Sequence, residues 1–182
     1  LQRLLRESGQ DASVGVLEKA SEVGAHSLSG AIVDPRALRE LFPDKNDQDF
    51  PFEAEVSEEH LYYLTETRKI PFPFIPPSMN HHGCYVASLG KLTRWLGEAC
   101  EKDGVDIFCG FAGTELLYDG DQVIGVRTGD RGIDKKGVQK QHFEPGADIH
   151  AKVVVLGEGT RGSLTKKLLH RHNLMDERNP QV

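Results

Sequence analysis

The sequence predicts an α/β fold, and two segments carry that prediction. Near the start, residues 13–19 read as a short buried strand that ends in an acid, and a glycine-bearing stretch follows at 24–30. Near the end, the β-branched run 151–156 leads into a Gly-Glu-Gly turn and then into a helix. Strands that end at an acid or at a glycine turn are typical of Rossmann-like dinucleotide-binding folds.

The composition narrows the class further. With 182 residues, 38% hydrophobic and 27% charged, the chain can bury one ordinary core and a small additional layer. A net charge of −6 and scattered Lys and Arg residues argue against nucleic-acid binding. The three cysteines, Cys84, Cys100 and Cys109, form no Cys-x-x-Cys pair, so neither a disulfide framework nor a thiolate metal site is expected. The sequence also lacks an apolar run long enough to span a bilayer.

The first elements resemble the tail of a βαβ unit. Leu1, Leu4 and Leu5 form a helical stripe that stops at a Ser-Gly pair, and the buried strand runs from Val14 to Glu18. In dinucleotide-binding folds such an acid follows a Gly-x-Gly-x-x-Gly turn by about 20 residues. Too few residues precede Glu18 for that turn, so we expect a fold truncated at its N-terminus.

The next segments change in character several times. An amphipathic helix is predicted over 35–41, with Asp34 as its N-cap and a proline at its first position. The acidic stretch 45–59 is expected to be a surface loop. The proline-rich run 70–77 cannot be a central strand, because proline lacks the ladder donor, and should lie at an edge or wrap a surface.

The second half alternates helix and strands. A helix over 89–103 has a clear apolar face and stops at Gly104. The expected strands are 105–108, then 114–118 and 122–128 as a hairpin around Asp-Gly-Asp, then 148–156 after the polar stretch 131–145. We therefore expect one partial domain, 1–182, in which 24–85 is an inserted loop and helix region and 114–148 is an antiparallel β-meander.

Four runs carry a resemblance to a known family. These are 24–30 (Gly-Ala-His-Ser-Leu-Ser-Gly), 37–44 (Ala-Leu-Arg-Glu-Leu-Phe-Pro-Asp), 79–85 (Met-Asn-His-His-Gly-Cys-Tyr) and 150–159 (His-Ala-Lys-Val-Val-Val-Leu-Gly-Glu-Gly). Together, in this order and spacing, they resemble the electron transfer flavoprotein:ubiquinone oxidoreductases. The similarity covers nearly the whole chain.

The resemblance implies an FAD/NAD(P)-binding fold of the glutathione-reductase type and an FAD enzyme. Such an enzyme takes electrons from electron transfer flavoprotein and passes them to ubiquinone at a membrane surface. The mitochondrial inner membrane or the bacterial plasma membrane would be its location, as a peripheral or monotopic protein. The family also carries a 4Fe-4S cluster, whose four cysteine ligands lie in a C-terminal region that this chain lacks.

The resemblance also implies which residues contact FAD. Glu18, followed by Lys19, matches the acid that binds the adenosine ribose. The loop of Ser27, Leu28, Ser29 and Gly30 matches a segment near the flavin, and the pair Phe111 and Ala112 matches the strand edge that meets adenine. The turn of Gly157, Glu158 and Gly159 would be a second flavin contact, where glycine allows close approach.

The segment from Ser29 to Phe42 resembles the family's membrane-surface helix, although Arg36, Arg39 and Glu40 put charge on its other face. The adjacent His81 and His82 are expected to be structural, because further metal ligands are not evident.

The sequence indicates no catalytic side chain, because the flavin itself carries out electron transfer. The isolated chain is expected to be inactive. Two alternatives remain open: a FixC-like or geranylgeranyl-reductase-like flavoprotein, and a non-catalytic fragment that folds only beside a complementary chain.

Overall fold

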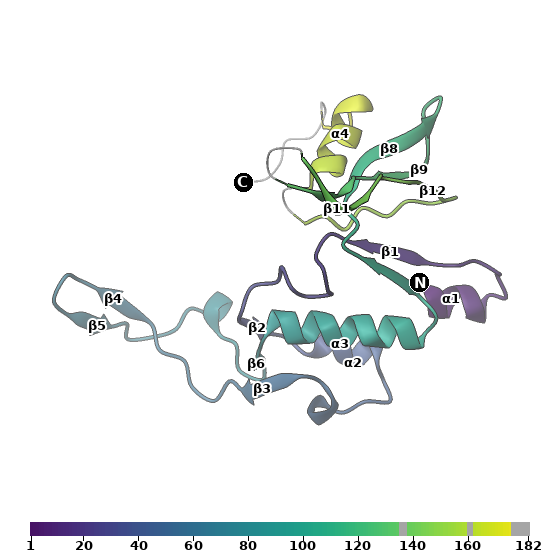
Figure 1. The fold of residues 1–182 in the computed structure, drawn as a ribbon. Helices are drawn as coiled ribbons and strands as arrows, with labels where there is room; N and C mark the ends of the chain where they lie inside the picture. Colours follow the sequence, from purple (N-terminus) through teal and green to yellow (C-terminus); the bar gives the residue numbers. More distant parts are fainter. Residues whose placement is uncertain (135–137, 160–161, 176–182) are drawn as a thin grey trace. The chain divides into compact units, whose positions relative to one another are not determined.

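The computed structural model describes residues 1–134, 138–159 and 162–175, and its backbone divides into two compact units. The first unit comprises Leu1–Val14 and Val23–Asp106, and the second comprises Gly15–Glu22 and Ile107–Val182 (Figure 1). Part of the predicted meander, 135–137, and the pair that follows the Gly-Glu-Gly turn, 160–161, lie outside the described residues.

The first unit is built on a small antiparallel sheet. Its strands are β2 (Ala31–Val33), β6 (Tyr85–Ala87) and β3 (Phe52–Glu55), with β6 in the centre. The core beside this sheet contains the buried side chains of Leu38, Phe50 and Leu92. Helices α2 (Arg36–Leu41) and α3 (Leu89–Lys102) supply two of these three residues, so the helices and the loop before β3 share one core (Figure 1).

Helix α3 confirms the prediction from periodicity almost residue for residue. The Ser88 side chain accepts a hydrogen bond from the Lys91 amide at 3.4 Å, which satisfies one of the free donors in the first turn. Gly104 follows the helix with φ of +84°, a backbone conformation that glycine adopts without strain.

The expected surface loop over 45–59 is wrong in part. This stretch contains the 3₁₀ turn η1 (Asp47–Asp49) and strand β3, and Phe50 and Val56 are only 4% and 8% exposed. The many acidic residues around them favour a loop by composition, but the aromatic rings of Phe50 and Phe52 pack at 5.5 Å and pull the segment onto the sheet.

Two further elements of the first unit lie outside its core. Helix α1 (Gln2–Glu7) contributes no buried side chain. Strands β4 (Tyr62–Leu64) and β5 (Lys69–Pro71) form an isolated antiparallel hairpin, followed by the 3₁₀ turn η2 (Pro77–Met79). Figure 1 shows the hairpin reaching away from β3 and β6. The proline-rich run therefore sits at a strand edge and on the surface, as predicted.

The second unit contains the elements that the dinucleotide-binding prediction rests on. Strand β1 (Gly15–Glu18) pairs with β7 (Asp106–Cys109). Strands β8 (Gly113–Asp119) and β9 (Gln122–Thr128) form the predicted hairpin, and β12 (Asp148–His150) adds to β9. Helix α4 (Ser163–Arg171) packs against β8.

One predicted boundary in this unit is wrong. The strand expected over 148–156 ends at His150, and the rest is not assigned to any strand, with Val153 and Val155 76% and 78% exposed. The polar stretch 131–145 contains a second hairpin, β10 (Arg131–Ile133) with β11 (Gln139–Glu144). A β-branched run forms a strand only when a neighbour pairs with it, whereas polar residues suffice where two segments meet.

Candidate functional site

Glu18 stands at the carboxyl end of β1, where the sequence places it. Its side chain is half-buried, and Oε1 accepts a hydrogen bond from the Ala20 amide at 2.6 Å, which fixes the carboxylate close to the strand end. The Phe111 amide donates to the Glu18 carbonyl at 3.0 Å, and the Gly110 amide donates to the Ala20 carbonyl at 2.6 Å. The structure thus brings together Glu18 and Phe111, two of the predicted contacts, while Lys19 is exposed beside them.

Phe111 and Ala112 lie between β7 and β8. The Ala112 carbonyl accepts a hydrogen bond from the Gly129 amide at 2.8 Å, so this carbonyl is engaged within the protein. The Phe111 ring meets Phe108 edge-on, with 6.5 Å between ring centres, and the Arg131 guanidinium lies 4.4 Å above it. Both rings and the cation therefore hold this edge in one arrangement. Arg131 was not predicted from the sequence, because a lone arginine in a polar stretch gives no signal.

The Gly-Glu-Gly turn, 157–159, has open space beside its two glycines, while its glutamate accepts hydrogen bonds from α4. A side chain added at either glycine would meet no atom within 4 Å, and Gly159 has φ of +72°. The Glu158 carboxylate caps helix α4 by accepting from the Leu164 amide at 3.1 Å and the Thr165 amide at 2.7 Å. Burial pushes the pKa of Glu158 up, but the hydrogen bonds from Thr165 and Leu164 outweigh it and leave that pKa below its usual value.

The remaining predicted contacts, Ser27 to Gly30, lie in the first unit. All four are exposed, and Leu28 is 77% exposed. The Ser27 amide donates to the Gly24 carbonyl at 3.1 Å, which closes a tight turn over residues 24–27, directly before the other three. Gly24 itself must be glycine, because its φ is +83° and a Cβ would lie 2.5 Å from the Gly90 carbonyl oxygen.

The second unit fits a dinucleotide in part. A fixed carboxylate at a strand end suits sugar hydroxyls, and two glycines facing open space suit close approach to a phosphate or a ring. Both carboxylate oxygens of Glu158 accept hydrogen bonds from amides at the start of α4. Its role here is to hold the helix start in place.

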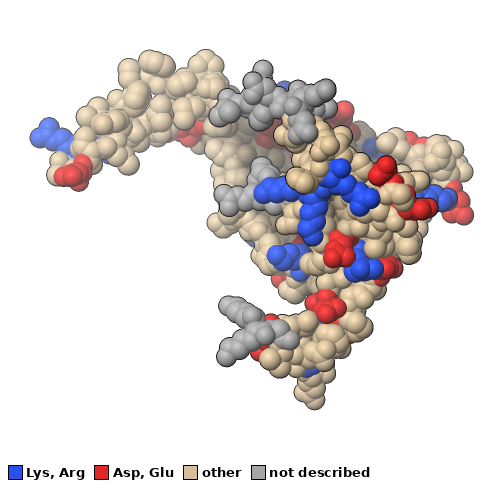
Figure 2. Space-filling view, turned by 90° about the horizontal axis from the view of Figure 1, so that it is seen from above, with Lys and Arg blue, Asp and Glu red and all other residues tan. Residues whose placement is uncertain are grey.

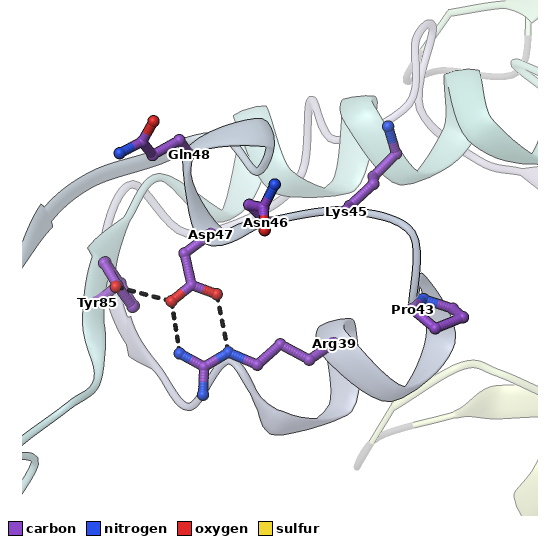
Figure 3. A pocket seen from close by; sticks show the side chains of 7 residues that line it. All are labelled: Arg39, Pro43, Lys45, Asn46, Asp47, Gln48 and Tyr85. Atoms are coloured by element: carbon purple, nitrogen blue, oxygen red, sulfur yellow. Dashed lines mark hydrogen bonds and ion pairs between the residues drawn. The ribbon is translucent and has the colours of Figure 1, made fainter.

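An open pocket of about 700 Å³ lies in the first unit, and none of the predicted contacts lines it. Its lining includes Arg39, Lys45, Asp47 and Tyr85, and Figure 3 shows Arg39 and Tyr85 both directed at the Asp47 carboxylate. The hydrogen bonds from Arg39 and Tyr85 lower the pKa of Asp47 to about 2, although partial burial opposes them. The same carboxylate raises the pKa of Tyr85. These polar groups satisfy one another, so we interpret the pocket as structural.

The His81 and Glu59 side chains form a pair at the base of the long excursion between β3 and β6. The Glu59 carboxylate accepts from the His81 amide at 2.8 Å and lies 2.5 Å from His81 Nδ1. Hydrogen bonds from His81 lower the pKa of Glu59. Within the described residues, no group of three His, Cys, Asp or Glu side chains could hold a metal ion.

The β4–β5 hairpin (62–71) and the residues directly after it expose apolar side chains that were not predicted as a site from the sequence. Leu64 is 72% exposed and Phe74 is 66% exposed, and a small apolar hollow is lined by Tyr63, Ile70 and Phe72 with two prolines. Figure 2 shows this arm as largely uncharged, with basic and acidic side chains at its tip. The signal in the sequence was an aromatic and apolar run flanked by prolines.

The predicted membrane segment from Ser29 to Phe42 has less apolar surface available. Leu38 is only 8% exposed, and Phe42 packs edge-on against Trp95 with 5.0 Å between ring centres. Leu28, Ile32 and Leu41 remain exposed in or beside this segment. Among the described residues, no helix has the length and apolarity that crossing a bilayer requires.

Comparison with curated proteins finds relatives that align with nearly the whole chain. The electron transfer flavoprotein-ubiquinone oxidoreductase of Dictyostelium discoideum is 44% identical over 183 residues, which is 100% of this chain and 30% of the relative. A probable electron transfer flavoprotein-ubiquinone oxidoreductase of Acinetobacter baylyi is 45% identical over 94% of this chain and 31% of its own length. The chain therefore spans about a third of the curated relatives it matches. No family model matches it.

Comparison with solved structures supports the fold class. The myxobacterial FAD-dependent halogenase CndH is 18% identical, covers 85% of this chain and 33% of its own, and superposes with a TM-score of 0.52. THI4 of Thermovibrio ammonificans is 16% identical, covers 94% of this chain and 56% of its own, and has a TM-score of 0.55. The predicted α/β fold of the FAD-binding type is confirmed at this level.

Proposed function

Because the chain is related over its whole length to electron transfer flavoprotein-ubiquinone oxidoreductases, we propose that it is part of an FAD-dependent oxidoreductase of that kind. The whole protein would take electrons from electron transfer flavoprotein and pass them to ubiquinone. The observation that carries this proposal is an identity of 42–45% that extends over nearly all of the 182 residues rather than over one glycine motif. The same identity makes this proposal more favoured than the alternatives, a FixC-like or a geranylgeranyl-reductase-like flavoprotein.

The geometry of the second unit supports FAD as the cofactor. Glu18 would accept hydrogen bonds from the ribose hydroxyls of the adenosine half, since its carboxylate is fixed at the end of β1. The edge at Phe111 would lie against adenine, and Gly157 and Gly159 would admit the cofactor closely. When bound, the flavin supplies the electron-transfer chemistry, and these residues bind and orient it.

The first unit supports contact with a lipid surface. Relatives with this name are mitochondrial in animals and also occur in bacteria, and ubiquinone is a substrate that partitions into membranes. We propose the β4–β5 hairpin as the main contact, since its exposed side chains include Tyr63, Leu64 and Ile70. The segment from Ser29 to Phe42 would contribute less, because its core-facing side chains are already packed. The protein would then be peripheral to the mitochondrial inner membrane or the bacterial plasma membrane.

A titration of the chain with FAD tests the proposal. Flavin fluorescence and the melting temperature are followed together, and saturable quenching with a rising melting temperature is expected. Quenching without any change in melting temperature would point to non-specific association. The absence of both effects would favour the alternative that these residues bind cofactor only beside a complementary chain.

A further inference from the structure

Arg131 is placed beside the cofactor edge by contacts that the dinucleotide-binding pattern does not require. It begins β10, and its guanidinium lies 4.4 Å above the centre of the Phe111 ring. Its Nη1 donates to Glu144 Oε2 on β11 at 3.1 Å, across the hairpin. The side chain is thus held from two sides, by an aromatic face and by a carboxylate on the paired strand.

The backbone at Gly110 leaves room for the Arg131 guanidinium. Its φ is +79°, and a Cβ built on it would lie 3.1 Å from Arg131 Nη2. The guanidinium therefore occupies the space that a side chain at this position would need. The Gly110 amide donates to the Ala20 carbonyl, and the Phe111 amide donates to the Glu18 carbonyl. Arg131 therefore contacts the same turn that supports Glu18, the candidate ribose ligand.

We propose that Arg131 is a positioning residue for the adenosine half of the cofactor, acting through the Phe111 ring. The inference rests on the proposed FAD function and adds Arg131, as a positioning residue, to the FAD contacts that the family resemblance implies. A cation over an exposed aromatic face contributes modestly, and more when the pair is desolvated. A bound adenine would cover the Arg131–Phe111 pair and remove water from it. Arg131 should therefore contribute more to cofactor affinity than to folding stability.

The experiment measures the dissociation constants of FAD and of ADP for this chain by isothermal titration. Arg131→Ala is expected to weaken both ligands by the same factor, about two- to fivefold. Arg131→Lys, which keeps a cation over the ring, should recover part of the loss. Arg127→Ala serves as the matched control, since Arg127 is an exposed arginine paired with Asp148 in the same unit.

A double-mutant cycle separates positioning from a general structural effect. In the Phe111→Leu background, Arg131→Ala should cause no further loss of ADP affinity, because the ring through which it acts is gone. Equal affinities for the wild type and Arg131→Ala would overturn this inference while leaving the FAD function intact. A loss for FAD without a loss for ADP, or additive losses in the cycle, would also overturn it. A wild-type chain that binds neither ligand would remove the proposed function and this inference with it.

Discussion

The guanidinium of Arg39 binds both carboxylate oxygens of Asp47, with Nε to Oδ1 at 2.8 Å and Nη2 to Oδ2 at 2.5 Å. The Tyr85 hydroxyl donates to the same carboxylate at 2.9 Å, as Figure 3 shows. Helix α2, the turn η1 and strand β6 are therefore tied together by one acid. A two-pronged pair of this kind adds geometric definition that a single hydrogen bond lacks.

This network predicts an acid-sensitive step in the stability of the first unit. The pKa of Asp47 is about 2 in the folded chain and near 4 when unfolded. Because the folded value is the lower one, the stabilisation is complete above about pH 4 and is lost as the pH falls toward 2. The melting temperature, followed by circular dichroism, should fall across this window.

The variant Asp47→Asn tests that assignment. Its melting temperature should be below that of the wild type at neutral pH, and the difference should shrink as the pH approaches 2. Asp44→Asn, at an exposed acid in the same loop, should follow the wild-type curve. A difference for Asp47→Asn that stays constant down to pH 2 would show that charge at this position is not the cause.

Local signals made a good part of this fold predictable. The turn between β8 and β9 is predictable because an Asp-Gly pair favours the positive φ that tight hairpins need. In the structure Gly120 has a positive φ, and Asp119 pairs with Gln122 across the turn. Helix α3 was found because a cap, an apolar face and a stop lie within one short stretch. Each of these features depends on neighbours in the sequence.

The features that sequence reasoning missed depend on distant partners. Phe50 is buried because Trp95, far along the chain, meets it edge-on with 5.5 Å between ring centres. The hydrogen bonds from the Leu164 and Thr165 amides to Glu158 were likewise not predicted from the sequence. Arg131 became visible as a candidate only when the fold placed it over Phe111. Residue type and spacing cannot report such contacts.

Glu18 should be the side chain on which cofactor affinity depends most. Glu18→Ala removes an ionised acceptor for the ribose hydroxyls, and hydrogen bonds to charged groups contribute about 1.5–3 kcal/mol. We expect a loss of roughly ten- to a hundredfold in FAD affinity, measured by fluorescence titration. Asp121→Ala, at an exposed acid in the turn between β8 and β9, is the control and should change the affinity little. An unchanged affinity for Glu18→Ala, in a variant that melts like the wild type, would contradict the assigned role.

Glu158 should act on stability as well as on binding. Replacing it with Ala removes the acceptor for the Leu164 and Thr165 amides at the start of α4. Loss of such a helix cap costs about 0.5–2 kcal/mol, so the free energy of unfolding should fall by about 1 kcal/mol in urea denaturation. Since its folded pKa is below the usual value, this contribution is present at neutral pH and declines as the pH falls below the ordinary range of a glutamate.

Glu158→Gln is the informative companion, because its amide oxygen can still accept one hydrogen bond. It should recover part of the stability lost in Glu158→Ala. Should both variants unfold at the wild-type urea concentration, the carboxylate would not be stabilising the helix, and a direct role toward the cofactor would be favoured instead.

The hairpin arm should be dispensable for folding and necessary for lipid contact. Leu64 and Phe74 are 72% and 66% exposed, so replacing both by Asp should change the free energy of unfolding by no more than about 0.5 kcal/mol per site. Burying such a side chain in lipid contributes about 1.5–3 kcal/mol. Co-sedimentation with vesicles of phosphatidylcholine and phosphatidylglycerol should therefore weaken at least tenfold.

Leu41→Asp provides the comparison for the other candidate segment, since Leu41 is a 48% exposed apolar residue on α2. If the hairpin makes the main contact, this variant should keep most of the vesicle binding, because only a small apolar area around Leu41 is open to lipid. If Leu41→Asp abolished binding and the hairpin double variant did not, the helix and not the hairpin would be the lipid-facing element.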